Sequence, residues 1–277
     1  MTTTWRKLKV KVATEMLDVL HDGSSTVKIL GEPHSQSIEY DSTKKEGILQ
    51  SIQMMDFQAK VAMLLRAELK RMGMLPPLPA EKYRVEIDVA SRRPKKELPL
   101  IEVMKSVVDG INKEIIGNDR SIYECCIINA GPQNVQSRST QPLDKLSVRI
   151  YPLSANTGSP VLSFSDVPIH IVPKEEPLLI DFDNDTRWEP YNWDLQKDVA
   201  KALQNDGMHL SGVGGPLQVK MTFTGGKVAG MDIDNMARVY LPILWNLGVN
   251  EEEVNAIHLY KQPVQGQQQS STSIVLQ

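Results

Sequence analysis

The chain has 277 residues, of which 41% are apolar and 23% are charged, and it contains 17 glycines and 17 prolines. This composition is typical of a globular protein and excludes collagen-like and fully disordered chains. No stretch approaches the roughly eighteen consecutive apolar residues of a membrane-spanning helix, and the first residues lack the apolar core of a signal peptide. We therefore expect a cytoplasmic protein without a membrane partner. Its two cysteines, Cys125 and Cys126, are adjacent, which leaves no disulfide framework and no thiolate zinc site.

The formal net charge of −3 conceals a difference between the two halves of the chain. Residues 1–150 hold 23 Lys and Arg against 19 Asp and Glu, whereas residues 151–277 hold 8 against 15. A basic half suits an anionic partner such as nucleic acid, and an acidic half can gather carboxylates around a divalent cation. Random drift of solvated surface charge explains the difference equally well.

The spacing of apolar residues predicts alternating strands and helices. In chain order we expect strands at 7–12 and 27–30, a long helix at 49–72, a strand at 83–89, a helix at 100–114, strands at 122–128, 146–151 and 169–172, a helix at 194–203, a strand at 217–223, a helix at 235–247, and strands at 254–260 and 273–276. The predicted class is a mixed α/β (α+β) protein.

The order of elements in the first half recurs in the second. Residues 80–89 align with residues 214–223 at an offset of 134, and Asn118-Asp119 aligns with Asn250-Glu251 at an offset of 132. These offsets predict a tandem duplication of a domain of roughly 130 residues, a common domain size. Chance similarity of two α/β halves is the alternative. On the duplication hypothesis the chain divides into an N-terminal extension (1–26), a first copy (27–151), a linker (152–167) and a second copy (168–277).

A pair of acids in the second half is the strongest local signal for chemistry. Asp232 and Asp234 are two residues apart, so on an extended segment their oxygens can converge on one hard cation. Arg238 comes round to the same face if a helix begins near residue 235, and Glu251 can supply a third carboxylate. Three acids and one arginine around Mg²⁺ suit phosphodiester hydrolysis. The competing interpretation is that Asp232 or Asp234 caps the helix.

These residues resemble the signature of the RusA family of Holliday-junction resolvases. The second half reads Asp232-x-Asp234-Asn235-x-x-Arg238 and, after thirteen residues, Asn250-Glu251, whereas the family has Asp-x-Asp-Asn-x-x-Lys followed by paired aspartates. The first half resembles the family in Tyr40-Asp41-Ser42, in the Arg-Arg-Pro loop after a strand, in Lys105 and in Asn118-Asp119. The resemblance covers residues 27–277 as two copies.

The first copy departs further from the family pattern than the second. Aligning on Lys105 places Pro99 and Ile101 where the family has its two helix-start acids, with only Glu97 and Glu102 nearby as substitutes. The first-copy site is thus degenerate, with Asp119 and Lys105 as its remaining members. In the second copy, the resemblance implies that Asp232, Asp234 and Glu251 bind magnesium, with Arg238 in place of the family's lysine.

The resemblance implies a Mg²⁺-dependent, structure-selective DNA endonuclease that acts on branched DNA in recombination and repair. The family's small domain acts as a homodimer, so two copies in one chain imply an internal pseudo-dimer, and a further oligomer remains open. Basic residues expected to hold DNA are Arg92, Arg93, Lys95, Lys96 and Lys105. The alternative is a catalytically decayed relative that binds DNA or another protein.

Overall fold

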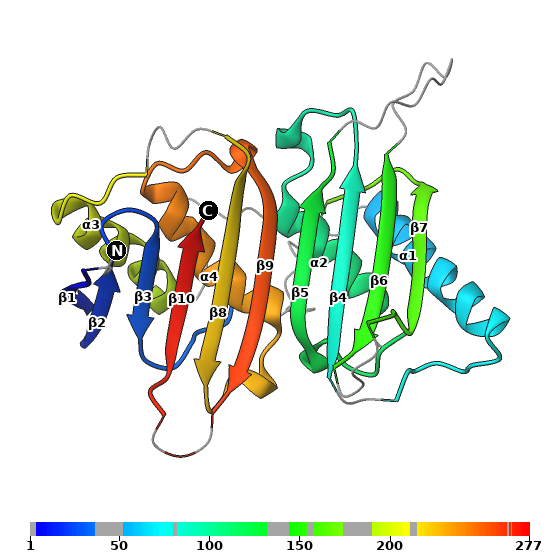
Figure 1. Cartoon of the computed structure of the whole chain (residues 1–277), viewed down its shortest axis with the longest axis horizontal. Helices are drawn as coiled ribbons and strands as arrows, with labels where there is room; N and C mark the ends of the chain where they lie inside the picture. The colour runs from blue at the N-terminus through cyan, green and yellow to red at the C-terminus, as the bar shows by residue number, and fades with distance from the viewer. Residues whose placement is uncertain are drawn as a thin grey trace. The chain divides into compact units, whose positions relative to one another are not determined.

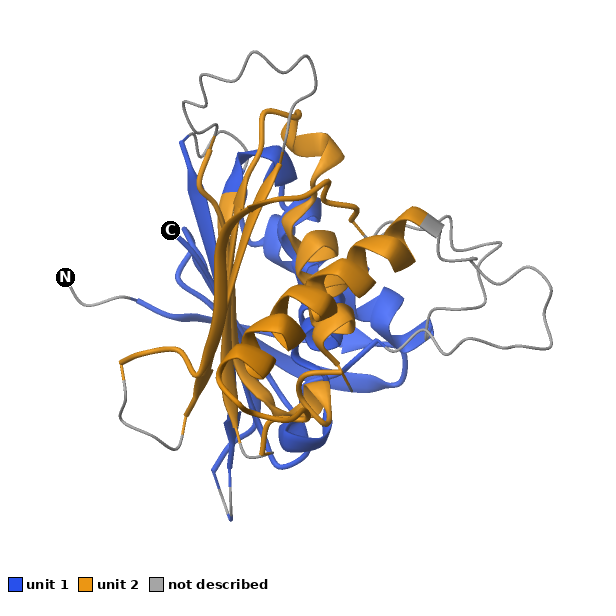
Figure 2. Cartoon of the chain, turned by 90° about the vertical axis from the view of Figure 1, so that its right-hand side faces the viewer, with its two compact units in different colours: residues 1–47, 177–254, 259–277 blue, residues 48–176, 255–258 orange. Residues whose placement is uncertain are grey.

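The computed structural model describes residues 4–36, 52–79, 82–112, 114–131, 144–153, 158–173, 190–210, 215–264, 266 and 268–277. The described residues form ten strands and four α-helices, so the expected mixed α+β class is confirmed. The chain divides into two compact units, each treated by itself below (Figure 2). Unit 1 comprises residues 1–47, 177–254 and 259–277, and unit 2 comprises residues 48–176 and 255–258.

Unit 2 is built from the middle of the chain. Its elements are α1 (Ile52–Arg71), β4 (Tyr83–Ala90), α2 (Leu100–Ile111), β5 (Ile122–Asn129), β6 (Lys145–Pro152) and β7 (Leu162–Pro168). The strands lie in the order β5-β4-β6-β7, with β4 parallel to β5 and antiparallel to β6, and with β6 antiparallel to β7. Helix α1 contacts α2 and β7, and α2 contacts β5, so both helices cover one face of this sheet (Figure 2).

Unit 1 combines the start of the chain with its last third. Its elements are β1 (Arg6–Val12), β2 (Glu15–His21), β3 (Thr26–Leu30), α3 (Pro190–Asn205), β8 (Leu217–Gly225), α4 (Ile233–Asn246), β10 (Ser271–Leu276) and β9 (Val254–Pro263), except that residues 255–258 of β9 are grouped with unit 2. The strands lie in the order β1-β2-β3-β10-β8-β9. Strands β8 and β9 point the same way (Figure 1), and the other printed pairings in this unit are antiparallel.

The cores of the two units follow from the periodicity of their sequences. Strand β4 buries Val85, Ile87 and Val89, while the alternate residues face outward and are partly exposed. Helix α2 packs so closely on α1 that a Cβ at Gly110 would lie 3.0 Å from the backbone oxygen of Gln58. A larger residue at this crossing would fit only if the backbone of α1 moved by a few tenths of an ångström.

Strand order is shared between the units. The order β5-β4-β6-β7 in unit 2 corresponds, strand by strand, to β9-β8-β10-β3 in unit 1. In each unit a helix joins the two central strands, α2 between β4 and β5 and α4 between β8 and β9. The last strand of the set differs in origin, because β7 follows β6 in the sequence whereas β3 precedes α3 by many residues.

The units divide the chain differently from the predicted domains. Residues 27–30, expected to begin the first copy, form β3, which pairs with β10 in unit 1. The expected linker at 152–167 contains most of β7. Residues 169–172 were predicted to form a strand, but they belong to none of the strands in the structure. Ile171 in this segment is nevertheless fully buried. Strand β2 was not predicted. Tyr40-Asp41-Ser42 lies outside the described residues.

Candidate functional site

The two acids at the start of α4 are held in different ways. Asp232 is the N-cap residue of α4, yet its side chain makes no capping bond to a backbone N–H. Its Oδ2 instead accepts a hydrogen bond from Asn235 Nδ2 at 3.1 Å. The residue thus occupies the cap position, as the competing interpretation expected, without the side-chain bond that defines a cap.

Asp234 and Arg238 lie one helical turn apart in α4, as their spacing predicted, and both are 0% exposed. Arg238 is the largest fully buried side chain among the described residues. A charged group is buried only when other groups compensate for the water it has lost, so this pair belongs to the interior of the protein.

Glu251, the expected third carboxylate, begins the one-turn helix η4 (Glu251–Glu253) after α4. Asn250 caps that turn, its side-chain oxygen accepting a hydrogen bond from the N–H of Glu252 at 3.1 Å. Burial, and then the neighbouring charge of Glu252, raise the pKa of the Glu251 carboxyl. Both causes disfavour the ionised form that a metal ligand needs.

The resemblance implies a magnesium ion at these residues, and their arrangement can be compared with what that ion needs. Within the part of the chain that the structure describes, no group of three or more His, Cys, Asp and Glu side chains could hold a metal. Mg²⁺ usually keeps several of its waters, whereas Asp234 is completely buried and Asp232 is hydrogen-bonded to Asn235. The residues as arranged do not fit the ion.

In the first half of the chain, the residues expected to form the degenerate site include a buried ion pair. Lys105 is 7% exposed, and its Nζ lies 3.2 Å from Asp109 Oδ1 on the next turn of α2. The N-cap of α2 is Pro99, and Ile101 is fully buried. Of the nearby acids, Glu102 is buried and Glu97 is exposed on the preceding turn. Lys105, expected to contact DNA, is thus buried in this structure and paired with Asp109.

Asp119 occupies a turn that matches the one at Glu251. It begins η2 (Asp119–Ser121), and Asn118 caps this turn by accepting a hydrogen bond from the N–H of Arg120 at 2.9 Å. Asp119 Oδ2 accepts a hydrogen bond from Asn112 Nδ2 at 2.8 Å. The carboxylate thus connects the end of α2 to the turn that starts β5.

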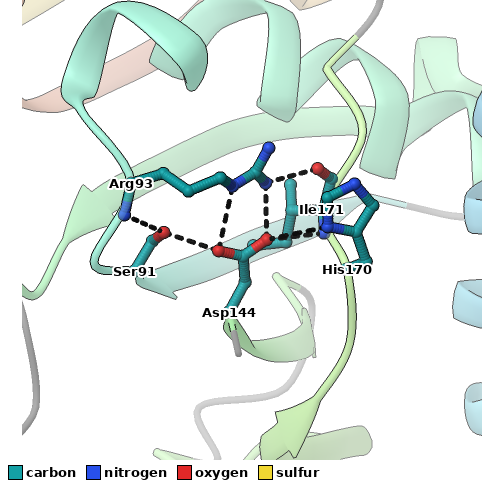
Figure 3. Close-up of polar contacts among 5 residues, drawn as sticks. All are labelled: Ser91, Arg93, Asp144, His170 and Ile171. Carbon is teal, nitrogen blue, oxygen red and sulfur yellow. Dashed lines mark hydrogen bonds and ion pairs between the residues drawn. The ribbon is translucent and has the colours of Figure 1, made fainter. Parts of the chain in front are cut away.

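Residues 92–96 form a basic turn that we expected to hold DNA. Within this basic turn, Arg93 is paired with Asp144, which lies far from it in the sequence (Figure 3). Its Nε lies 3.1 Å from Asp144 Oδ1, and a terminal nitrogen lies 2.5 Å from Asp144 Oδ2 and 2.5 Å from the carbonyl oxygen of Ile171. The Arg93 side chain is 14% exposed and that of Asp144 is 0% exposed. Two parallel bonds of this kind fix an arginine in one geometry.

Two further donors complete the environment of Asp144. Ser91 Oγ donates to Asp144 Oδ1 at 2.5 Å, and the N–H of Ile171 donates to Oδ2 at 2.9 Å. His170 lies beside the same carboxylate, 3.7 Å from Oδ2. Serine and histidine both approach the aspartate, and no bond within this cluster links them to each other, so it lacks the proton relay of a catalytic triad (Figure 3). The cluster ties the end of β4 to the segment after β7.

The other members of the basic turn differ in exposure. Arg92 and Lys96 are exposed, whereas Lys95 is half-buried and its Nζ donates to the side-chain oxygen of Asn255. Of the four basic residues expected to bind phosphate at this turn, two thus remain on the surface.

The half-exposed face of the unit 2 sheet carries a network of opposite charges. Arg149 Nε lies 3.0 Å from Glu86 Oε2, and a terminal nitrogen lies 2.7 Å from Asp88 Oδ2. Tyr151 donates its hydroxyl to Glu86 at 3.0 Å, and the Arg84 guanidinium lies 4.1 Å from the centre of the Tyr151 ring. Opposite charges pair along this face, so its arginines add little positive potential.

Sequence reasoning missed Asp144 because it lies in a polar stretch, 51 residues from Arg93, with no motif around it. Comparisons with protein-family models, curated proteins and solved structures found no match. Among the described residues, no helix is long and apolar enough to cross a membrane.

Proposed function

We propose that this chain is a duplicated protein of the RusA type that binds branched DNA without cutting it. The observation that carries the proposal is the complete burial of Asp234 and Arg238. A group that binds a metal or stabilises charge on a phosphodiester must reach the reacting atoms, within about 3 Å. Two charged side chains with no exposed surface serve the stability of α4 instead.

Duplication is supported by features that recur at equivalent places. Both units share a strand order, and in each an asparagine caps the one-turn helix that leads into the second parallel strand. Lys105 and Arg238 each occupy the sixth position of the helix between the two parallel strands. We infer from these correspondences that the two units descend from one domain and together replace the family's homodimer.

The proposal of DNA binding rests on the formal charge of unit 2 and on the exposed residues of its basic turn. This unit holds 17 Lys and Arg against 15 Asp and Glu, whereas unit 1 holds 14 against 19. The exposed Arg92 and Lys96 lie on the turn after β4 and are the residues we assign to phosphate contacts. Arg93 and Lys95 fix the conformation of that turn through Asp144 and Asn255.

A second candidate function is the Mg²⁺-dependent endonuclease. It is favoured by the placement of Asp232, Asp234, Asn235 and Arg238 at the start of α4, with Glu251 on the turn that follows, which is the order of the family signature. This candidate requires α4 and its surroundings to rearrange, because the carboxylates as arranged do not fit the ion.

A binding assay tests the first proposal. A labelled four-way DNA junction is titrated with wild type, with Arg92→Ala/Lys96→Ala and with the control Lys60→Ala/Lys70→Ala, which removes two exposed lysines of α1. We expect the first double variant to reduce the log–log salt slope by up to about 1.8, or roughly 0.9 per lost phosphate contact. The control should leave the slope unchanged.

Equal slopes for the two double variants would remove the basic turn from the DNA-binding surface. No binding to the junction by wild type would refute DNA as the partner and would leave a protein-interaction module. Cleavage in Mg²⁺ that stops in EDTA would favour the endonuclease.

A further inference from the structure

Unit 1 contains a cavity of about 220 Å³ whose lining includes neither Asp232 nor Asp234. It lies where β2 and β3 face α3 and α4, and all of its lining residues belong to this unit. Its floor is apolar and includes Ile29, Leu195 and the ring of Tyr240, all of them buried. Its rim is polar and carries Glu15, Glu32, His34 and Tyr191. An apolar floor with a few polar groups is typical of a small-ligand site.

The rim combines an aromatic pair with a carboxylate. The rings of His34 and Tyr191 lie 4.5 Å apart at an interplanar angle of 30°. The Tyr191 hydroxyl donates to Glu15 Oε2 at 3.2 Å, while Glu15 itself is exposed. Burial, and then the charge of Glu15, raise the pKa of the Tyr191 phenol, so it stays neutral and continues to donate. An aromatic ring beside a carboxylate attracts cations.

Glu32 brings a second negative charge that is fixed in place. Its carboxylate accepts hydrogen bonds from Ser270 Oγ at 2.6 Å and from the N–H of Gly226 at 3.1 Å. The bond from Ser270 is the main reason that the pKa of Glu32 is lowered, which keeps this group ionised at neutral pH. A Cβ at Gly225 would lie 2.5 Å from Glu32 Oε2, so only glycine leaves the carboxylate its position.

One cation near the carboxylates of the cavity is Lys227, outside the lining, whose charge contributes to the lowered pKa of Glu32. None of the ten residues that line the cavity is lysine or arginine. Because Lys227 partly offsets the charge of Glu32, the carboxylate of Glu15 at the rim supplies the negative charge that favours a cationic occupant.

We propose that this cavity binds an organic cation with a short apolar stem, that is, an alkyl-ammonium or alkyl-guanidinium group. The stem lies on Ile29, Leu195 and Tyr240, and the cationic head lies between Glu15 and the face of Tyr191. Such a group occurs both in free diamines and as the lysine or arginine side chain of a protein. The inference is independent of DNA binding, because no residue of the basic turn takes part.

Isothermal titration of the full chain with three probes tests the inference. Agmatine represents the free cation, the blocked peptide acetyl-Gly-Arg-Gly-amide represents a protein side chain, and N-butylurea is a neutral control. We expect saturable binding of agmatine, the peptide or both, with a Kd on the order of 0.1–1 mM, and none of N-butylurea. Binding of agmatine alone assigns the site to free amines, and binding of the peptide alone assigns it to a protein partner.

Variants connect the binding to the cavity. Glu15→Gln and Tyr191→Leu should each weaken the cation roughly tenfold or more, whereas the control Glu68→Gln, on α1 of unit 2, should not. Thermal unfolding of each variant verifies that it folds. The inference is overturned if neither cation binds below about 10 mM, if N-butylurea binds as tightly, or if both cavity variants bind like wild type.

Discussion

Lys105 and Arg238 occupy the same position, the sixth residue, of α2 and α4, and both are buried, at 7% and 0% exposure. In the signature of the RusA family, which these residues resemble, this position carries an active-site lysine. Here both cationic side chains are buried in the protein, and Lys105 forms an ion pair with Asp109. The helix position that would carry a catalytic side chain in an open site is therefore buried in both halves of the chain.

Loss of the Arg238 charge should destabilise the protein strongly. Removing one member of a buried charged arrangement leaves the rest uncompensated, and this typically costs about 3–5 kcal/mol. We expect Arg238→Ala to lower the urea midpoint by a corresponding amount, and Lys201→Ala, at an exposed position of α3, to change it by less than about 0.5 kcal/mol. A cost below about 1 kcal/mol for Arg238→Ala would show that the residue is solvated in solution.

Arg93 and Arg92 are neighbours with opposite expected effects. Arg93→Ala leaves the buried Asp144 carboxylate without its guanidinium, so it should cost about 3 kcal/mol of stability. Arg92→Ala, on the exposed side of the turn, should cost less than about 0.5 kcal/mol and weaken DNA binding instead. Urea unfolding and junction binding of the two variants decide the assignment, which fails if Arg92→Ala is the more destabilising.

Cys126 should react slowly with thiol reagents. Burial, followed by the charges of Glu86 and Asp88, raises the pKa of the Cys126 thiol to about 12. The thiolate is the reactive form, so at pH 8 the folded protein should react on the order of 10³-fold more slowly than a free cysteine. The rate is measured with a chromogenic disulfide in a Cys125→Ala background, with urea-unfolded protein as the control. A folded-state rate near that of the control would contradict this environment.

The ionised carboxylate of Glu251 should lower the stability of the folded protein at neutral pH. Its folded-state pKa is raised, so ionisation is less favourable in the folded than in the unfolded protein. The penalty is present above the folded pKa and disappears as the pH falls below the ordinary carboxyl value near 4.5. Glu251→Gln should therefore raise the urea midpoint at pH 7, by less than about 1 kcal/mol for a partly buried group, with the gain vanishing near pH 4. A loss of stability at pH 7 would contradict the raised pKa.

Elements with regular periodicity were predicted from the sequence to within a few residues. Strand β4, expected at 83–89, runs from Tyr83 to Ala90, and α2, expected at 100–114, runs from Leu100 to Ile111. In both, one face is buried and the pattern of apolar residues reports it. The spacing of Asp234 and Arg238 also predicted correctly that they lie one turn apart.

Elements that depend on distant contacts were missed. The turn before β2 has Ala13 at φ 50° and none of the Gly, Asn or Pro signals of a turn. Strand β7 has a weak apolar pattern and a residue of positive φ, Asp166. Residues 169–172 alternate like a strand, yet Ile169 and Ile171 donate their N–H groups to Asp144 rather than to a neighbouring strand. Burial of the α4 charges likewise depends on packing that spacing alone does not report.

Incubation of a labelled four-way junction with wild type and Asp234→Asn, each in Mg²⁺ and in EDTA, distinguishes DNA binding from DNA cleavage. We predict that both proteins bind the junction, that neither cleaves it in either condition, and that Mg²⁺ does not raise the thermal stability of wild type. Mg²⁺-dependent cleavage by wild type that Asp234→Asn abolishes would refute binding without cleavage and establish α4 as a catalytic element.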